Sequence, residues 1–265
     1  MKLAISNLAW PAEQEKTILA LMKQYGYTGL EIAPGKVIPV DPYGNINEAK
    51  KWANMMGRDR QLSIISLQSI WYGRQEMLFG DLAERNFLLN YTMKAIDFAN
   101  AVGAKNLVFG CPKNRNIPKN ADLNNAHSLA VDFFRQLGDY ALDREVVIGM
   151  EANPAIYGTN FLNTTQDALK FIKQVDSEGV KLNFDVGTLL ANNEGLDVLA
   201  DNIEMISHVH ISEPGLKMIE KRKLHNELAE ILEKNGYNKY VSIEMVNISN
   251  AELKQCMEYV RSVFC

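Results

Sequence analysis

Four residues whose side chains can bind a metal ion or move a proton close four short apolar segments in the second half of the sequence. They are Glu151 after Val-Val-Ile-Gly-Met, Asp185 after Leu-Asn-Phe, His210 after His-Val, and Glu244 after Val-Ser-Ile. The positions are 34 (151 to 185), 25 (185 to 210) and 34 (210 to 244) residues apart, about one strand plus one helix each. If the segments are neighbouring parallel strands, three carboxylates and one imidazole should meet at one end of a barrel.

This combination of side chains favours a metal site. Three carboxylates in one small volume repel one another, and at least one takes up a proton unless a cation is present. Three oxygen ligands with one nitrogen suit Mn²⁺ best, and also Co²⁺ or Mg²⁺, with Zn²⁺ less favoured. The alternative is that each acid forms an unrelated ion pair. Four such residues in succession favour one divalent ion held by Glu151, Asp185, His210 and Glu244.

A second histidine, His208, stands two residues before His210. On a strand the two side chains point to the same side, with His208 one layer deeper. We expect His208 to be a supporting neighbour that orients His210, and a core histidine with satisfied hydrogen bonds is the alternative. The other two histidines, His127 and His225, fall in helical segments and are expected at the surface.

The elements that would position these residues alternate along the whole chain. The strand-like segments are Lys2–Asn7, Gly29–Ala33, Leu62–Gln68, Lys105–Phe109, Val146–Glu151, Val180–Asp185, the stretch from Ser207, and Tyr240–Met245. Each is followed by a helix-like segment, which predicts an α/β fold formed by a single (β/α)8 TIM barrel over residues 1–265. A doubly wound dinucleotide-binding sheet is disfavoured because 6–10 contains no glycine.

Composition narrows the classes of protein. The chain has 265 residues, of which 47% are hydrophobic, enough for a sizeable core, and its formal net charge of −4 argues against a nucleic-acid partner. No segment has the pattern of a signal peptide or membrane span, so a cytoplasmic protein without a membrane partner is expected. Cys111, Cys256 and Cys265 show no paired spacing and are expected to be reduced.

The four candidate ligands also carry a family resemblance. Glu151, Asp185, His210 and Glu244 are similar, in order and spacing, to the Glu-Asp-His-Glu metal set of the xylose isomerase-like TIM-barrel superfamily, the sugar phosphate isomerase/epimerase family. The stretch 28–33, Thr-Gly-Leu-Glu-Ile-Ala, also resembles its second strand. The resemblance implies a metal-stabilised enediolate, with Glu151 and Glu244 as the acid/base pair.

The segment from His208 to Glu213, followed by Lys217, resembles the part of ketose 3-epimerases that supplies a metal-binding histidine, an acid and an arginine for the sugar. The resemblance implies that Glu213 and Lys217 hold the substrate. One position departs from the pattern, because Thr188 stands where those epimerases carry a histidine. Substrate contact at this position must therefore differ.

Further candidates for substrate binding lie in the segments after the predicted strands. An aromatic wall with several cations would suit a sugar that bears a phosphate or carboxylate, and asparagine can bind hydroxyls. An ordinary solvated loop or a structural turn is the alternative. The candidates are Trp71, Tyr72, Arg74, Lys113, Arg115 and Asn153.

The expected function is that of a metal-dependent isomerase or epimerase acting on a carbohydrate: a sugar, a sugar phosphate or a related keto-polyol. A dehydratase of a keto-sugar or keto-cyclitol shares the same enolate chemistry and is the alternative. An apurinic endonuclease is less favoured, since that branch needs further histidines and this chain has four in all. A non-catalytic metal-binding scaffold is the remaining alternative. Members of this superfamily often form dimers or tetramers, so a homo-oligomer is compatible with the resemblance.

Overall fold

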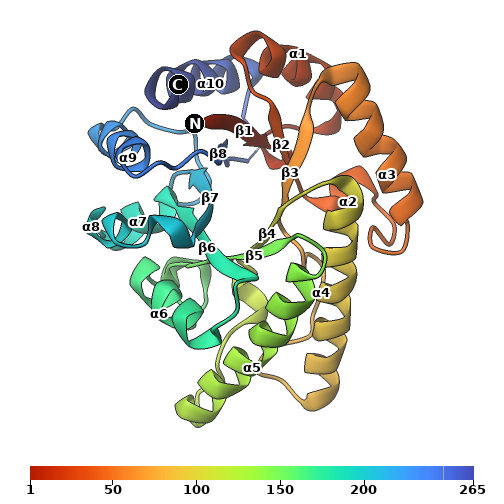
Figure 1. Ribbon diagram of the computed structural model, residues 1–265, viewed down its shortest axis with the longest axis vertical. Coiled ribbons are helices and arrows are strands. Elements are labelled where there is room, and N and C mark those ends of the chain that lie inside the picture. The colour runs from red at the N-terminus through yellow and green to blue at the C-terminus, as the bar shows by residue number, and fades with distance from the viewer. Residues whose placement is uncertain (247) are drawn as a thin grey trace.

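Eight parallel strands form a closed barrel in the computed structural model, which describes residues 1–246 and 248–265. The strands follow one another around the barrel in chain order, and β1 pairs with β8 to close it (Figure 1). The predicted (β/α)8 TIM barrel is confirmed. The strands are β1 (Lys2–Ser6), β2 (Gly29–Ile32), β3 (Ser63–Leu67), β4 (Asn106–Phe109), β5 (Val147–Glu151), β6 (Val180–Asp185), β7 (Ile206–Ile211) and β8 (Tyr240–Ile243).

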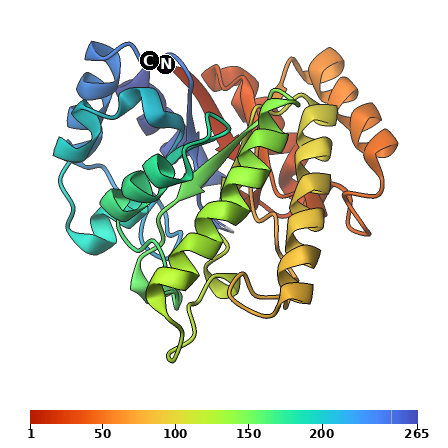
Figure 2. The same ribbon diagram turned by 60° about the horizontal axis from the view of Figure 1, so that its bottom comes forward.

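The helices lie outside the strands, and Figure 2 shows the two longest, α4 and α5, side by side across one flank of the barrel. Among the described residues, no helix combines the length and the apolar character that crossing a bilayer requires. The α-helices are α1 (Glu15–Tyr25), α2 (Pro34–Val37), α3 (Ile46–Met55), α4 (Leu82–Val102), α5 (Leu123–Leu142), α6 (Thr165–Val175), α7 (Val186–Asn192), α8 (Asp197–Ala200), α9 (Lys223–Lys234) and α10 (Asn250–Phe264). Short 3₁₀ turns are η1 (Asn7–Ala9), η2 (Ala12–Gln14), η4 (Pro112–Asn114), η5 (Ala155–Tyr157) and η6 (Ile203–Met205), and η3 (Met56–Arg60) is a π-helical turn.

Local capping explains where the longer helices begin and end. Asp81 caps α4 in a capping box with Glu84, and Thr164 caps α6 in the same way with Asp167. Gly26 ends α1 in the left-handed conformation that glycine adopts without steric cost. These caps satisfy backbone groups that the helices themselves leave unpaired.

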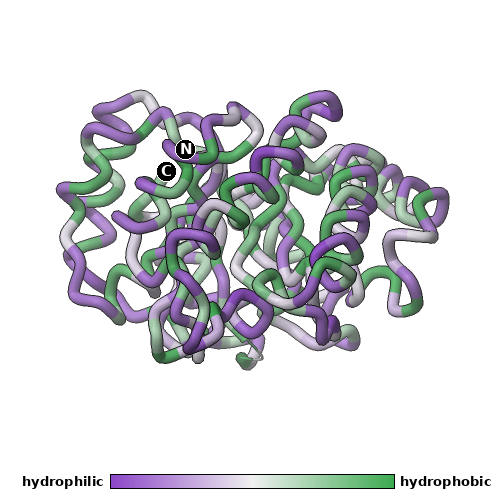
Figure 3. The backbone as a smooth tube through the Cα atoms, turned by 90° about the horizontal axis from the view of Figure 1, so that it is seen from below, coloured by the Kyte–Doolittle hydropathy of each residue, from purple (hydrophilic) through white to green (hydrophobic). Residues whose placement is uncertain are grey.

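The core lies between the strands and the inner faces of the helices. Along the helices in Figure 3 the backbone tube alternates between hydrophobic and hydrophilic colours, as expected for helices with one face packed on the barrel. An aromatic cluster joins β4 to its covering helices: the ring of Phe109 lies 4.6 Å from that of Phe134, which in turn lies 5.7 Å from that of Phe171. These edge-to-face contacts hold α5 and α6 against the barrel wall.

Residues 196–206 contain α8 and η6, and Ile206 already belongs to β7. One expectation from the sequence differs from the structure. His225, expected at the surface, is fully buried on the inner face of α9, where its Nδ1 lies 3.0 Å from the hydroxyl of Tyr259. Its position on the face of α9 that also buries Leu228, Ala229 and Leu232 accounts for this burial.

Candidate metal centre

The structure brings Glu151, Asp185, His210 and Glu244 together at the C-terminal ends of their strands. One ligand atom from each of the four lies within 4.8 Å of those from all the others. Glu151 and Asp185 end β5 and β6, His210 lies beside Asp185 in the register of β7, and Glu244 directly follows β8. Because apolar side chains on either side anchor each strand, these four polar groups project together into the barrel.

His210 lies at the centre of the cluster. Its Nδ1 is 3.0 Å from Oε1 of Glu151 and 3.2 Å from Oε2 of Glu244, and its side chain is fully buried. Among the described residues, no lysine or arginine side chain forms an ion pair with Glu151, Asp185 or Glu244. Three carboxylates therefore share one imidazole as their nearest source of positive charge.

The electrostatics of the site follow from this shortage of positive charge. The pKa of Glu244 is raised to about 7: burial is the largest cause, His210 opposes it, and the charges of Glu151 and Asp185 add to the rise. Burial and the carboxylate of Glu151 also raise the pKa of Asp185. Burial disfavours protonation of His210, but Glu31 and Glu244 outweigh it and hold the pKa of His210 well above its ordinary value. A divalent cation would relieve this repulsion, and three carboxylates with one imidazole are a donor set that Mn²⁺ accepts.

Hydrogen bonds from behind orient the carboxylates. Asp185 caps α7: its Oδ2 accepts from the backbone N–H of Thr188 at 2.7 Å and lies 2.9 Å from the Thr188 hydroxyl. Its Oδ1 accepts from the hydroxyl of Ser212. Glu151 accepts from Asn183 at 2.8 Å and from Asn153 at 3.1 Å. Thr188, which stands where ketose 3-epimerases carry a histidine, thus helps to position Asp185, one of the candidate metal ligands.

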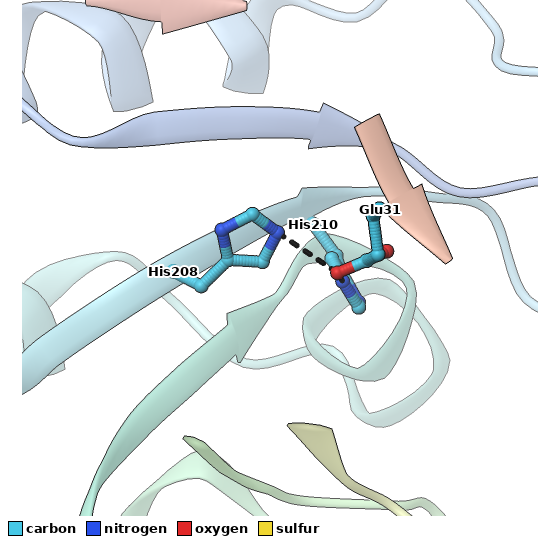
Figure 4. Close-up of side chains that lie close together, drawn as sticks. All are labelled: Glu31, His208 and His210. Atoms are coloured by element: carbon cyan, nitrogen blue, oxygen red, sulfur yellow. Dashed lines mark hydrogen bonds and ion pairs between the residues drawn. The ribbon is translucent and has the colours of Figure 1, made fainter. Parts of the chain in front are cut away.

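The opposite edge of His210 faces Glu31, a residue that the sequence did not single out as functional. Oε2 of Glu31 lies 3.1 Å from Nε2 of His210 and 3.1 Å from Nε2 of His208, and Figure 4 shows the carboxylate between the two imidazoles. Gln68 donates to the other Glu31 oxygen at 3.1 Å. His208 also packs edge-on against His210, with the ring centroids 5.1 Å apart, so it is a neighbour of His210 as well as a second partner of Glu31. Burial opposes ionisation of Glu31, but the two histidines hold its pKa below the ordinary value.

Above the four ligands lies a cavity of about 180 Å³. Asn153 and Tyr157 line it, together with Leu8, Ser69 and Leu216. The amide oxygen of Asn153 is buried with no hydrogen-bond partner among the described residues, so this predicted substrate-binding residue has a free acceptor in the cavity wall. Tyr157, which the sequence did not single out, lies in the turn after β5, where no motif marks it.

Two other predicted substrate contacts lie outside this cavity. Glu213 is buried and forms a two-pronged ion pair with Arg222, at 2.7 and 2.6 Å, and it also accepts from the backbone N–H of Glu220 at 3.1 Å. Lys217 is exposed, and the cavity wall is formed instead by the preceding residue, Leu216. Glu213 therefore fixes the loop after β7, and neither Glu213 nor Lys217 forms part of the cavity wall.

The segments after β3 and β4 are also placed differently from the expectation. Arg115 is fully buried and donates to the carbonyl oxygens of Glu151 at 2.9 Å and Leu162 at 3.3 Å; burial lowers its pKa to about 10. Trp71 is buried too, and its indole N–H donates to Thr92 at 2.8 Å. Arg115 thus supports the backbone behind Glu151 and Trp71 packs in the core, because both find partners inside the fold.

Arg74 and Lys113 line a second cavity, and the buried Trp71 also borders it. This cavity of about 650 Å³ lies between the segments after β3 and β4, and Tyr72 forms part of its wall. It meets the cavity above the metal centre at Ser69, Cys111 and Pro112. Arg74 therefore borders the approach to the metal centre and does not reach the four ligands.

Comparison with known proteins identifies the family to which this barrel and its cluster of candidate ligands belong. The chain belongs to the xylose isomerase-like TIM barrel family, whose model matches residues 19–263. The predicted resemblance is confirmed. Among curated protein sequences, none matches this chain significantly.

Solved structures share the fold over nearly the whole chain. A 3-keto-D-glucoside 4-epimerase from E. coli is 21% identical with a TM-score of 0.78, and the match covers 99% of each chain. A D-psicose 3-epimerase from Clostridium cellulolyticum H10 is 20% identical with a TM-score of 0.76, covering 100% of this chain and 99% of that one. A family 2 AP endonuclease from Brucella melitensis is 17% identical with a TM-score of 0.75, covering 96% of each.

Proposed function

We propose that this protein is a divalent-metal-dependent isomerase or epimerase of a keto-sugar. The observation that carries the proposal is the placement of two glutamates around one histidine. Glu151 on β5 and Glu244 after β8 both lie within 3.2 Å of Nδ1 of His210, and β6 and β7 stand between them. Two carboxylates that approach one point from different strands can take a proton from one face of a substrate carbon and return a proton to the other.

The metal would be held by Glu151, Asp185, His210 and Glu244, with Mn²⁺ as the favoured ion. When bound, such an ion supplies Lewis-acid polarisation of a carbonyl oxygen. The Asn153 and Asn183 amides hold the Glu151 carboxylate in one orientation. Glu151 ends β5 and Glu244 follows β8, so the Glu244 carboxylate approaches His210 from the other side of β7, where it can accept or give a proton.

Asn153 and Tyr157 would position the substrate. The free amide oxygen of Asn153 can accept from a substrate hydroxyl, and the Tyr157 side chain forms part of the cavity wall beside it. The names of the structural neighbours support a keto-sugar substrate: besides the two epimerases above, they include an L-ribulose 3-epimerase. All are below 25% identity, so the choice of sugar is left to experiment.

The proposal is tested by proton exchange. The chain is stripped with a chelator, reloaded with Mn²⁺, and incubated in D₂O with a panel of ketopentoses and ketohexoses. We expect deuterium at the carbon next to the carbonyl, in both the substrate and an epimer or isomer, and none with the metal-free protein. Loss of water from the sugar would indicate a dehydratase instead, and absence of exchange with every keto-sugar would contradict both.

A further inference from the structure

A third cavity, larger than the two described above, also adjoins the metal centre. Its volume is about 790 Å³, and it is bordered by the segments after β1, β2, β3 and β8 together with part of α4. It shares Leu8 and Ser69 with the cavity above the four ligands, so the two spaces meet along this edge. A molecule bound at the metal centre can therefore extend into the larger cavity and stay in contact with the protein along its length.

The sizes of the two spaces bear on the substrate. The cavity above the ligands, about 180 Å³, falls below the roughly 300–1,000 Å³ that is usual for small-molecule sites. The adjoining cavity lies well inside that range. The metal centre thus accommodates the reacting part of a substrate, and the fold provides further room for a part that does not react.

The lining of the larger cavity suits an uncharged ring that carries hydroxyl groups. Tyr72 is 88% exposed, and the guanidinium of Arg74 lies 5.2 Å from the centre of the Tyr91 ring. Nε of Arg74 is buried without a hydrogen-bond partner, and Arg74 forms no ion pair with any described carboxylate. Its donors are therefore available to a ligand.

The remaining charged groups argue against a phosphate in this cavity. Asp41 is part of the same lining and would repel an anion. The ammonium of Lys36 already donates to the carbonyl oxygens of Asn7 and Trp10, both at 2.6 Å. One free arginine beside one acid, the exposed Tyr72 ring and the half-buried Tyr91 ring form a surface for hydrogen bonds and ring stacking.

We propose that the substrate is a glycoside: the keto-sugar unit, in the form that carries a free carbonyl, reacts at the metal centre, and a second, uncharged sugar ring occupies the cavity lined by Leu8, Gly35, Asp41, Tyr72, Arg74 and Tyr91. This inference rests on the proposed function for the reacting ring only. The second ring is recognised by residues that take no part in the chemistry.

Gly35 offers a way to fill the cavity without disturbing the barrel. It lies in α2, and a Cβ added to it would meet no atom within 4 Å. Gly35→Trp should place an indole in the cavity, and Gly35→Ala, which adds one methyl group, is the matched control. Both variants leave the four ligands and their hydrogen bonds unchanged.

Two measurements on the full-length protein test the inference. The first is binding of methyl β-D-glucopyranoside, followed by saturation-transfer NMR with the Mg²⁺-loaded protein. The second is kcat/KM for deuterium exchange with Mn²⁺, for D-fructose, fructose 6-phosphate and 6-O-α-D-glucopyranosyl-D-fructose. We expect the glucosylated ketose to be preferred at least about tenfold over the other two, a difference of about 1.4 kcal/mol. Gly35→Trp should abolish binding of the glucoside and remove this preference, with D-fructose unchanged.

The outcomes separate the inference from the proposed function. Glucoside binding that Gly35→Trp leaves intact, or a preference for fructose 6-phosphate, overturns the inference whatever the enzyme does. Equal losses for D-fructose and its glucoside in Gly35→Trp also overturn it. If no ketose exchanges its proton but Gly35→Trp, and not Gly35→Ala, abolishes glucoside binding, the glycosyl site stands and the proposed function fails.

Discussion

Glu31 and His210 are joined across the interior of the barrel, with Oε2 of one 3.1 Å from Nε2 of the other. The carboxylate belongs to β2 and the imidazole to β7, so closure of the barrel is needed to bring them together. The contact leaves Nδ1 of His210 facing Glu151 and Glu244. Glu31 thereby fixes which nitrogen of His210 is presented to a metal ion.

Replacing Glu31 should therefore weaken metal binding although Glu31 is not itself one of the four ligands. We expect Glu31→Gln to lower the affinity for Mn²⁺ by about 10–100-fold, the usual effect of losing a carboxylate that supports a metal-binding histidine. Calorimetric titration with Mn²⁺ measures the change. The exposed Glu204→Gln is the control, and equal affinity in the two variants would show that Glu31 does not support His210.

The ion pair between Glu213 and Arg222 should contribute to stability and little to the site. Glu213→Gln leaves part of a buried, charge-assisted hydrogen-bond network unmade, and we expect it to lower the free energy of unfolding by about 1.5–3 kcal/mol. Urea unfolding measures this loss, and Mn²⁺ affinity should stay within about twofold of the parent. If Glu213→Gln is as stable as the parent but has a much higher KM, Glu213 takes part in substrate binding instead.

Gly110 allows the close approach of Glu151 to β4. A Cβ at this position would come within 2.8 Å of Oε2 of Glu151, so Gly110→Ala should push the carboxylate aside. We expect a loss in kcat of up to about 100-fold, since a displacement of about 1 Å at a reacting group has effects of this size. Steady-state kinetics tests this, with Gly57→Ala as control because a Cβ there meets only one backbone oxygen, at 3.9 Å. Full activity in Gly110→Ala would show that Glu151 tolerates the shift.

Burial of His225 should make stability depend on pH. Burial lowers its pKa to about 4, with Glu213 opposing and Arg222 adding to the shift. Between this value and the ordinary pKa of about 6.5, the unfolded chain binds more protons than the folded protein, so stability falls as the pH falls. The loss at pH 5 relative to pH 7.5 should be about 2 kcal/mol from this residue.

Urea unfolding of the parent and of His225→Gln at several pH values isolates this contribution. The variant should lose less stability on acidification than the parent, whereas Tyr259→Phe, which removes the hydrogen-bond partner but keeps the imidazole, should follow the parent. Parallel curves for His225→Gln and the parent would contradict the assignment.

The order of strands and the four candidate ligands could be predicted because both depend on local pattern. An apolar segment that ends in a polar group predicts a barrel strand whose end faces the opening. This holds for Glu151 and Asp185, which end their strands, and for Glu244, which directly follows β8. The same pattern is weaker at Glu31, because this carboxylate lies within the strand segment Gly-Leu-Glu-Ile and not at its end. Its partner is 179 residues away, and only the closed barrel reveals it.

The loop residues could not be predicted in the same way. The sequence predicts Arg115 as a substrate-binding residue because its charge suits a sugar that bears an anionic group. It predicts Glu213 and Lys217 because their segment resembles that of ketose 3-epimerases. Their directions depend on tertiary partners: Arg115 turns inward to backbone carbonyls, and Glu213 turns to Arg222. The sequence does not reveal these partners. It therefore cannot predict whether a charged side chain in a loop after a strand points into the cavity.

The most direct test of the metal centre is anomalous diffraction from crystals of the Mn²⁺-loaded protein, recorded at the manganese edge. We predict one peak per chain, within bonding distance of Nδ1 of His210 and of the carboxylates of Glu151, Asp185 and Glu244. No peak at these ligands, or a peak between Glu31 and His208 instead, would contradict the account.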